Sequence, residues 1–232
     1  MRRPPDTHGR TLRGFSIFNE TVVYHESDLE RRVSTVLQLR KDVRKIYSQY
    51  PVLLYRDADG EIREHICDYS VVFDGGEMVA VVVKHARKEA AMRDMIDRVR
   101  ALGFLKKSKS GIIAPAAVGD IRLLTERHAT YGAFERAGRI LRARRMRDDA
   151  EYARTLAIVR NLGGQFKFGE LLRGCPDRAA RRTAVLLLID DLVLVTEGSG
   201  SIDDLTMLRV ANSGAAQPAT PHFSTKGIDH AA

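Results

Sequence analysis

Asp68 and Lys84 are the residues whose types and spacing point most directly to chemistry. Asp68 closes the run His65-Ile66-Cys67-Asp68, and Lys84 follows the apolar run that begins at Met78. The turn signal Asp74-Gly75-Gly76 between them predicts two adjacent antiparallel strands, which would bring the two side chains together. A carboxylate beside a lysine at a sheet edge could hold Mg²⁺ and polarise a water, while the ammonium stabilises charge that develops on a phosphate.

Alternating helix and strand patterns surround this pair. Ser27 and Glu30 form a capping box, and apolar residues recur behind them at helical spacing, which predicts a helix over 28–45. The run Met78–Val83 is apolar throughout and is typical of a central strand buried on both faces. The other predicted elements are strands over 46–56, 61–73, 77–84, 112–117 and 121–124, helices over 86–102 and 131–147, and a short strand or core cover over 15–24.

The region after residue 147 has a different rhythm. Helical patterns over 152–162, over 168–173 and after Pro176 are followed by β-prone runs at 193–195 and 207–210. Three helices followed by a two-stranded wing is the order of a winged helix. Residues 211–232 contain few large apolar groups and are predicted to be a disordered tail, and residues 1–14 a flexible arm.

Composition restricts the classes of protein. The chain has 232 residues and a formal net charge of +8, and 29 of its 38 cations are arginine, which favours an anionic partner. Two cysteines, Cys67 and Cys175, exclude a disulfide framework. No apolar run approaches the ~18–20 residues of a membrane span, and no secretory signal is recognisable. A cytoplasmic protein without a membrane partner is therefore expected, associated with the nucleoid when it binds DNA.

Three groups of cations are candidate DNA contacts. The helix over 131–147 carries arginines with no acid interleaved after residue 136, unlike a solvated helix of mixed charge. The helix after Pro176 would be the recognition helix, whose N-terminal residues face the bases. The candidates are Arg136, Arg139, Arg142 and Arg145 in the first helix, Arg178, Arg181 and Arg182 in the second, and Lys106 and Lys107 in a basic loop.

The segment His65–Lys84 resembles the core of the PD-(D/E)xK restriction-endonuclease-like superfamily. More narrowly, residues 26–84 resemble the N-terminal nuclease domain of TnsA-type heteromeric transposase endonuclease subunits, through Ser27–Glu30, Gln49, Pro51, Asp68 and Lys84. The resemblance implies an α/β restriction-endonuclease-like mixed-sheet core over 15–147 and a winged-helix domain over 148–210. It implies catalytic roles for Glu30, Asp68 and Lys84, a Mg²⁺ or Mn²⁺ cofactor, DNA as substrate, and two partners: a strand-transfer transposase subunit and an ATPase regulator.

One residue departs from the family pattern. Val82 stands where the family has an acid or glutamine, and valine cannot coordinate a metal. Glu30 and Asp68 could suffice as metal ligands together with backbone carbonyls, or Glu89 could supply the missing carboxylate. His65 and His85 flank the motif and could also reach a metal or phosphate. Glu30 is equally explained as the capping partner of Ser27. The alternatives are a catalytically silent DNA-binding or assembly module on the same fold, and a stand-alone restriction or repair nuclease.

Overall fold

The computed structural model describes residues 13–107 and 111–211, in two compact units that divide between Phe134 and Glu135. The division falls inside a helix and before the predicted boundary at residue 147. The predicted arm and tail lie outside the described residues, apart from residues 13, 14 and 211. No helix in the described ranges is long and apolar enough to cross a membrane.

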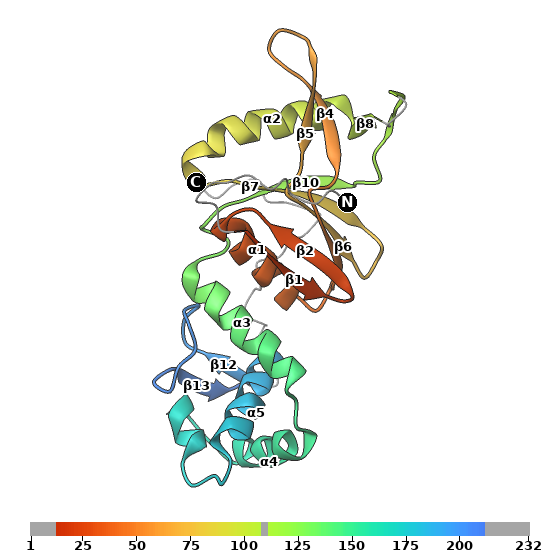
Figure 1. Ribbon diagram of the computed structural model, residues 1–232. Helices are drawn as coiled ribbons and strands as arrows, with labels where there is room; N and C mark the ends of the chain where they lie inside the picture. Colours follow the sequence, from red (N-terminus) through yellow and green to blue (C-terminus); the bar gives the residue numbers. More distant parts are fainter. Residues whose placement is uncertain (1–12, 108–110, 212–232) are drawn as a thin grey trace. The chain divides into compact units, whose positions relative to one another are not determined.

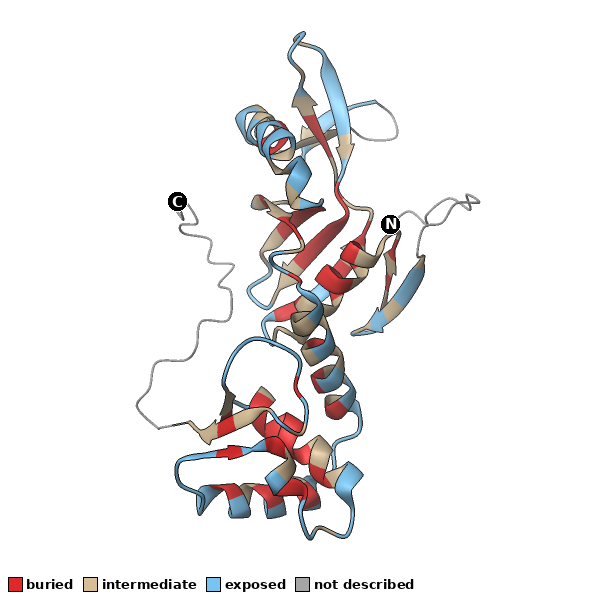
Figure 2. Cartoon of the chain, turned by 90° about the vertical axis from the view of Figure 1, so that its left-hand side faces the viewer, coloured by how far each residue is buried: buried red, intermediate tan, exposed pale blue. Residues whose placement is uncertain are grey.

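A four-stranded mixed sheet forms the centre of the N-terminal unit. Its order is β10-β7-β6-β3, where β3 is Val43–Ser48, β6 is Tyr69–Phe73, β7 is Met78–Val83 and β10 is Asp120–Leu124. The β3–β6 and β6–β7 pairs are antiparallel and the β7–β10 pair is parallel. The prediction that Met78–Val83 is a central strand is confirmed, since β7 has a neighbour on each side and is buried from Val79 to Val83 (Figure 2).

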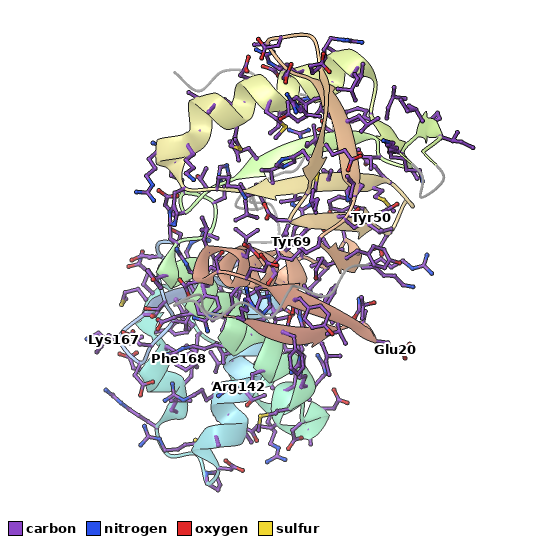
Figure 3. The ribbon with its side chains drawn as sticks, turned by 45° about the horizontal axis from the view of Figure 1, so that its top comes forward. Glu20, Tyr50, Tyr69, Arg142, Lys167 and Phe168 are labelled. Atoms are coloured by element: carbon purple, nitrogen blue, oxygen red, sulfur yellow. The ribbon has the colours of Figure 1, made fainter. Side chains whose placement is uncertain are left out.

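Two helices cover opposite faces of this sheet (Figure 1). Helix α1 spans Asp28–Leu39, and the 3-10 helix η1 over Ala86–Lys88 leads into α2 over Glu89–Leu102. On the α2 face, Val82 and Ile121 pack with Met95 and Val99 in one apolar cluster. On the α1 face, the Tyr69 hydroxyl donates to the carbonyl oxygen of Glu30 at 3.2 Å, which places the ring between sheet and helix (Figure 3).

Helix α1 begins where the sequence predicts and ends earlier. The Ser27 hydroxyl accepts the Glu30 N–H at 3.2 Å, as a capping residue does. The predicted helix over 28–45 is wrong beyond Leu39, because Arg40 has extended backbone angles and Val43 starts β3. Residues Val43 and Ile46 are buried while Arg44 and Lys45 face solvent, in a strand that contains a β-bulge.

Two of the predicted strands are each broken into two. The strand expected over 46–56 is divided between the end of β3 at Ser48 and β4, which runs over Val52–Arg56. The strand expected over 61–73 is β5, Ile62–Ile66, followed by a break at Cys67-Asp68 and then β6. Strands β4 and β5 form a separate hairpin, and Asp57 closes its turn by accepting the N–H groups of residues 59 and 61.

Two smaller hairpins complete the N-terminal unit. The first consists of β1, Gly14–Phe18, and β2, Thr21–His25. For residues 15–24 the sequence predicts either a short strand or a segment that covers the core. The second consists of β8, Leu105–Lys107, and β9, Ile113–Pro115.

The C-terminal unit contains helices and a small antiparallel sheet of order β11-β13-β12. The helices predicted over 131–147, over 152–162, over 168–173 and after Pro176 are present, and so are the strands predicted at 193–195 and 207–210. Strand β11 was not predicted from the sequence. Chain order is α3 Tyr131–Arg145, shared with the first unit, α4 Asp149–Arg160, β11 Gln165–Lys167, η2 Phe168–Leu172, α5 Arg178–Asp190, β12 Leu194–Thr196 and β13 Met207–Val210.

Candidate functional site

Asp68 and Lys84 lie side by side at the point where β6 begins and β7 ends. Oδ2 of Asp68 accepts the backbone N–H of Val83 at 2.6 Å, and Nζ of Lys84 lies 3.2 Å from Oδ2 and 3.5 Å from Oδ1. The Asp68 side chain is 10% exposed and that of Lys84 33%. The break between β5 and β6 therefore positions a nearly buried carboxylate, fixed by a backbone donor, beside an ammonium that reaches solvent.

Glu30 approaches this pair from α1. Its carboxylate is buried and accepts hydrogen bonds from the backbone N–H of Glu26 at 2.8 Å and from the Ser27 hydroxyl at 2.9 Å. Burial raises the pKa of Glu30, and the negative charge of Asp68 raises it further, while Lys84 acts in the opposite direction. Glu30 thus serves as the capping partner and also lies within the electrostatic field of the pair.

The site contains two carboxylates, those of Glu30 and Asp68, and one cation, Lys84. Among the described residues no three His, Cys, Asp or Glu side chains converge as a group that could hold a metal ion. Two carboxylates fit a Mg²⁺ ion that keeps several waters and takes further oxygens from a bound phosphate, which is the usual mode for this ion. They do not fit a metal that needs a complete cage of protein ligands.

Glu89 does not join this site, which corrects the expectation that it replaces the carboxylate missing at residue 82. It lies in the first turn of α2, where Oε1 is 2.8 Å from Nη2 of Arg93 and Oε2 is 3.4 Å from Nη1 of Arg127. The hydrogen bond from Arg93 lowers the pKa of Glu89. Its carboxylate is therefore engaged by arginines.

The two flanking histidines have different surroundings. The buried Nε2 of His65 has no hydrogen-bond partner within the described residues, and burial lowers the pKa of its imidazole. His85 is exposed, and its Nδ1 lies 3.4 Å from Oε2 of Glu126, which also accepts the Ala86 N–H at 3.0 Å. Glu126 is not among the site residues singled out from the sequence; its position two residues after the end of β10, the strand parallel to β7, is the signal that could have identified it.

Two of the α3 arginines hold the loop between β12 and β13. Arg136 donates to the Thr196 hydroxyl at 2.6 Å and to the carbonyl oxygens of Gly198 and Gly200 at 3.0 and 3.1 Å. Arg139 donates to the carbonyl oxygen of Ile202 at 2.6 Å. These contacts explain both arginines without DNA. The other two candidates in α3, Arg142 and Arg145, are exposed, and Arg142 can be located in Figure 3.

Helix α5 differs from the expected recognition helix. Arg181 is buried, pairs with the carboxylate of Glu151 and donates to the Leu171 carbonyl at 3.2 Å, so its assignment as a DNA contact is wrong. Arg182 lies 2.7 Å from Asp204, whereas Arg178 is exposed and acts on the Asp204 carboxylate through its charge. The helix is buried at every position from Ala184 to Ile189, which leaves only its N-terminal part for contact with a ligand.

Lys106 and Lys107 both lie in β8, rather than in a loop. Lys107 is exposed and Lys106 is half-buried.

Comparison with protein-family models and with curated protein sequences found no match to this chain.

Proposed function

We propose that this chain is a metal-dependent DNA endonuclease with a restriction-endonuclease-like core. The observation that carries the proposal is the fixed pair of Asp68 and Lys84, with the carboxylate of Glu30 in the same electrostatic field. The order of elements supports it: helix α1, three antiparallel strands β3, β6 and β7, helix α2, and the parallel strand β10 make a mixed sheet between two helices. This is the layout that the resemblance implies.

Each residue would have a distinct role in phosphodiester hydrolysis. Asp68 and Glu30 would hold Mg²⁺ or Mn²⁺, which when bound polarises the phosphate and lowers the pKa of a coordinated water. Lys84 reaches solvent beside Asp68 and would stabilise the negative charge that develops on the phosphate oxygens. The N–H of Val83 keeps the Asp68 carboxylate in one orientation, so that it need not reorganise during the reaction.

The C-terminal unit supports a narrower proposal, that the chain is a TnsA-type subunit. The order α4, β11, η2, α5, β12, β13 and the sheet order β11-β13-β12 fit a winged helix. We propose that the chain is the endonuclease subunit of a multi-protein transposase and cleaves at transposon ends. Its partners would be a strand-transfer subunit and an ATPase regulator, and the exposed Arg178 would contact DNA.

A catalytically silent module on the same fold is the second candidate. Val82 packs in the apolar cluster beneath α2, and no third metal-ligating side chain joins Glu30 and Asp68 within the described residues. Such a module would bind DNA or assemble with partners without cleaving. A stand-alone restriction or repair nuclease would instead cleave without any partner.

A plasmid-nicking assay separates the three. Purified protein is incubated with supercoiled plasmid carrying candidate transposon ends, with Mg²⁺, Mn²⁺ or EDTA, and with or without a candidate strand-transfer transposase subunit. Nicking that requires both metal and partner supports the transposase subunit. Nicking without the partner supports the stand-alone nuclease. DNA binding without nicking in any combination supports the silent module. Asp68→Asn is the control for contaminating nuclease.

A further inference from the structure

The turn that leaves β7 carries an unusual concentration of cations. Lys84, His85, Arg87 and Lys88 fall within five residues, and the last two belong to η1. The turn joins the end of β7 to the start of α2 (Figure 1), so it lies at the same strand end as the Asp68–Lys84 pair. Arg87 and Lys88 are both exposed.

Neighbouring arginines in α2 are neutralised by acids. Arg93 pairs with Glu89 at 2.8 Å, Arg98 with Asp94 at 2.9 Å, and Arg100 with Asp97 and Asp120 at 3.3 and 3.2 Å. In contrast, the side chains of Arg87 and Lys88 make no hydrogen bond or ion pair within the described residues. These two charges are therefore available to an external anion.

The backbone beneath these two cations is held in place. The N–H of Lys84 donates to the Leu124 carbonyl at 3.1 Å, and the N–H of Lys88 donates to the His85 carbonyl at 2.8 Å. Between them, the N–H of Ala86 donates to the Glu126 carboxylate at 3.0 Å. Arg87 and Lys88 consequently project from a fixed turn, which reduces the entropy lost when they bind a ligand.

The net charge of the site indicates why further cations are needed near it. Glu30 and Asp68 together carry up to two negative charges and Lys84 carries one positive charge, so an ionised, metal-free site would repel a phosphate. A polyanionic strand needs further positive charge close to this centre. Arginine suits bidentate phosphate contacts, and lysine adds a flexible point charge.

We propose that Arg87 and Lys88 bind backbone phosphates of the DNA strand that is presented to Asp68 and Lys84. This inference rests on the DNA-binding part of the proposed function and not on cleavage. The partner is the phosphodiester backbone, so the contact carries no sequence preference.

The test measures DNA affinity as a function of salt. Binding of a fluorescent duplex is followed by anisotropy in EDTA, for the wild-type chain and for the double variant Arg87→Ala, Lys88→Ala. Each lost phosphate contact should lower the slope of log K against log salt by about 0.9, and should weaken binding on the order of tenfold at 0.1 M salt. The charge-preserving variant Arg87→Lys, Lys88→Arg should keep most of the slope.

The matched control is the double variant Arg93→Ala, Arg98→Ala. It changes the net charge by the same amount in α2, the helix that directly follows η1, but it removes arginines that already have acid partners. A slope that falls by about two contacts in the first variant and by much less in the control supports the proposal. Equal slopes in the wild type and in the Arg87, Lys88 variant overturn it.

These binding titrations and the plasmid-nicking assay together distinguish this inference from the proposed function. A wild-type chain that binds DNA but never nicks it, together with a reduced slope in the double variant, keeps the phosphate contacts and rejects the nuclease. Nicking that persists while the double variant binds like the wild type rejects the contacts and keeps the nuclease. A wild-type chain that binds no DNA overturns both.

Discussion

Replacing Asp68 with Asn and with Ala separates two contributions of this carboxylate: the hydrogen bond that it accepts from Val83 and the negative charge that it places beside Lys84. In the structure one oxygen accepts the buried N–H of Val83 at 2.6 Å, and the same group faces Lys84 at 3.2 Å. Asparagine keeps a carbonyl oxygen for Val83 and removes the negative charge. Alanine removes both, and leaves the Val83 N–H without its acceptor in a buried position.

The expected magnitudes follow from these contacts. An unsatisfied buried donor costs about 1–3 kcal/mol. The lost ion pair contributes about 1 kcal/mol or less, because the Lys84 side chain is one-third exposed and solvent screens it. Asp68→Ala should therefore lower the free energy of unfolding by about 1–4 kcal/mol, and Asp68→Asn by about 1 kcal/mol or less. Both variants should lose metal-dependent cleavage, since each lacks a carboxylate ligand.

Urea denaturation of the three proteins gives the stability differences, and nicking in Mg²⁺ gives the activity of each folded variant. DNA affinity in EDTA serves as the control, because phosphate contacts dominate it and should survive both substitutions. Wild-type cleavage by Asp68→Asn would show that Asp68 is not a metal ligand. Equal stability of the Asn and Ala variants would show that the Val83 hydrogen bond does not have the energetic role assigned to it.

Three further outcomes are expected. Because burial raises the pKa of Glu30, the folded state holds that proton more tightly and stability falls as pH rises above the usual value of 4.5; Glu30→Gln should remove this fall in pH-dependent denaturation, and an unchanged profile contradicts the assignment. Burial lowers the pKa of His25 from 6.5 to about 4, so stability should be lost as pH falls through this window, by up to about 3 kcal/mol, and His25→Phe should lack that loss. Arg181→Ala leaves the buried Glu151 carboxylate with only the exposed Arg154 as its ion-pair partner, and should cost about 3 kcal/mol in thermal or chemical denaturation. Arg178→Ala should change stability by about 0.5 kcal/mol or less while weakening DNA binding; similar stabilities of the two variants would refute this distinction.

Local signals account for what could be predicted around the site. The Ser27–Glu30 capping box fixes the start of α1, and the apolar run to Val83 identifies a central strand. The hairpin between β6 and β7 then brings Asp68 and Lys84 together, because antiparallel strands joined by a short turn place residues at their far ends side by side. Each of these steps depends on residues close in the sequence.

Long-range pairing accounts for what could not be predicted. Arg181 sits among other arginines in the sequence, and nothing local shows that Glu151 of another helix will meet it in the interior. The same holds for Arg136, whose partners lie around Gly198. A cluster of cations in one sequence predicts positive charge, but only the tertiary structure shows which of its members already have an internal partner. Arg87 and Lys88, which have no such partner among the described residues, were not among the candidates.

The position of Val82 changes how the missing signature acid should be understood. Its side chain packs with Leu53, Cys67 and Ile121 in a closed apolar cluster, and burial raises the pKa of the neighbouring Cys67 thiol to about 12. A glutamate placed there would be buried in the same surroundings, at the cost of desolvating a charge or retaining its proton. Residue 82 thus lies in a hydrophobic core that suits valine and not a charged carboxylate. Under the proposed function, Asp68 and Glu30 would therefore be the carboxylate ligands of the metal among the described residues, without a side chain from residue 82.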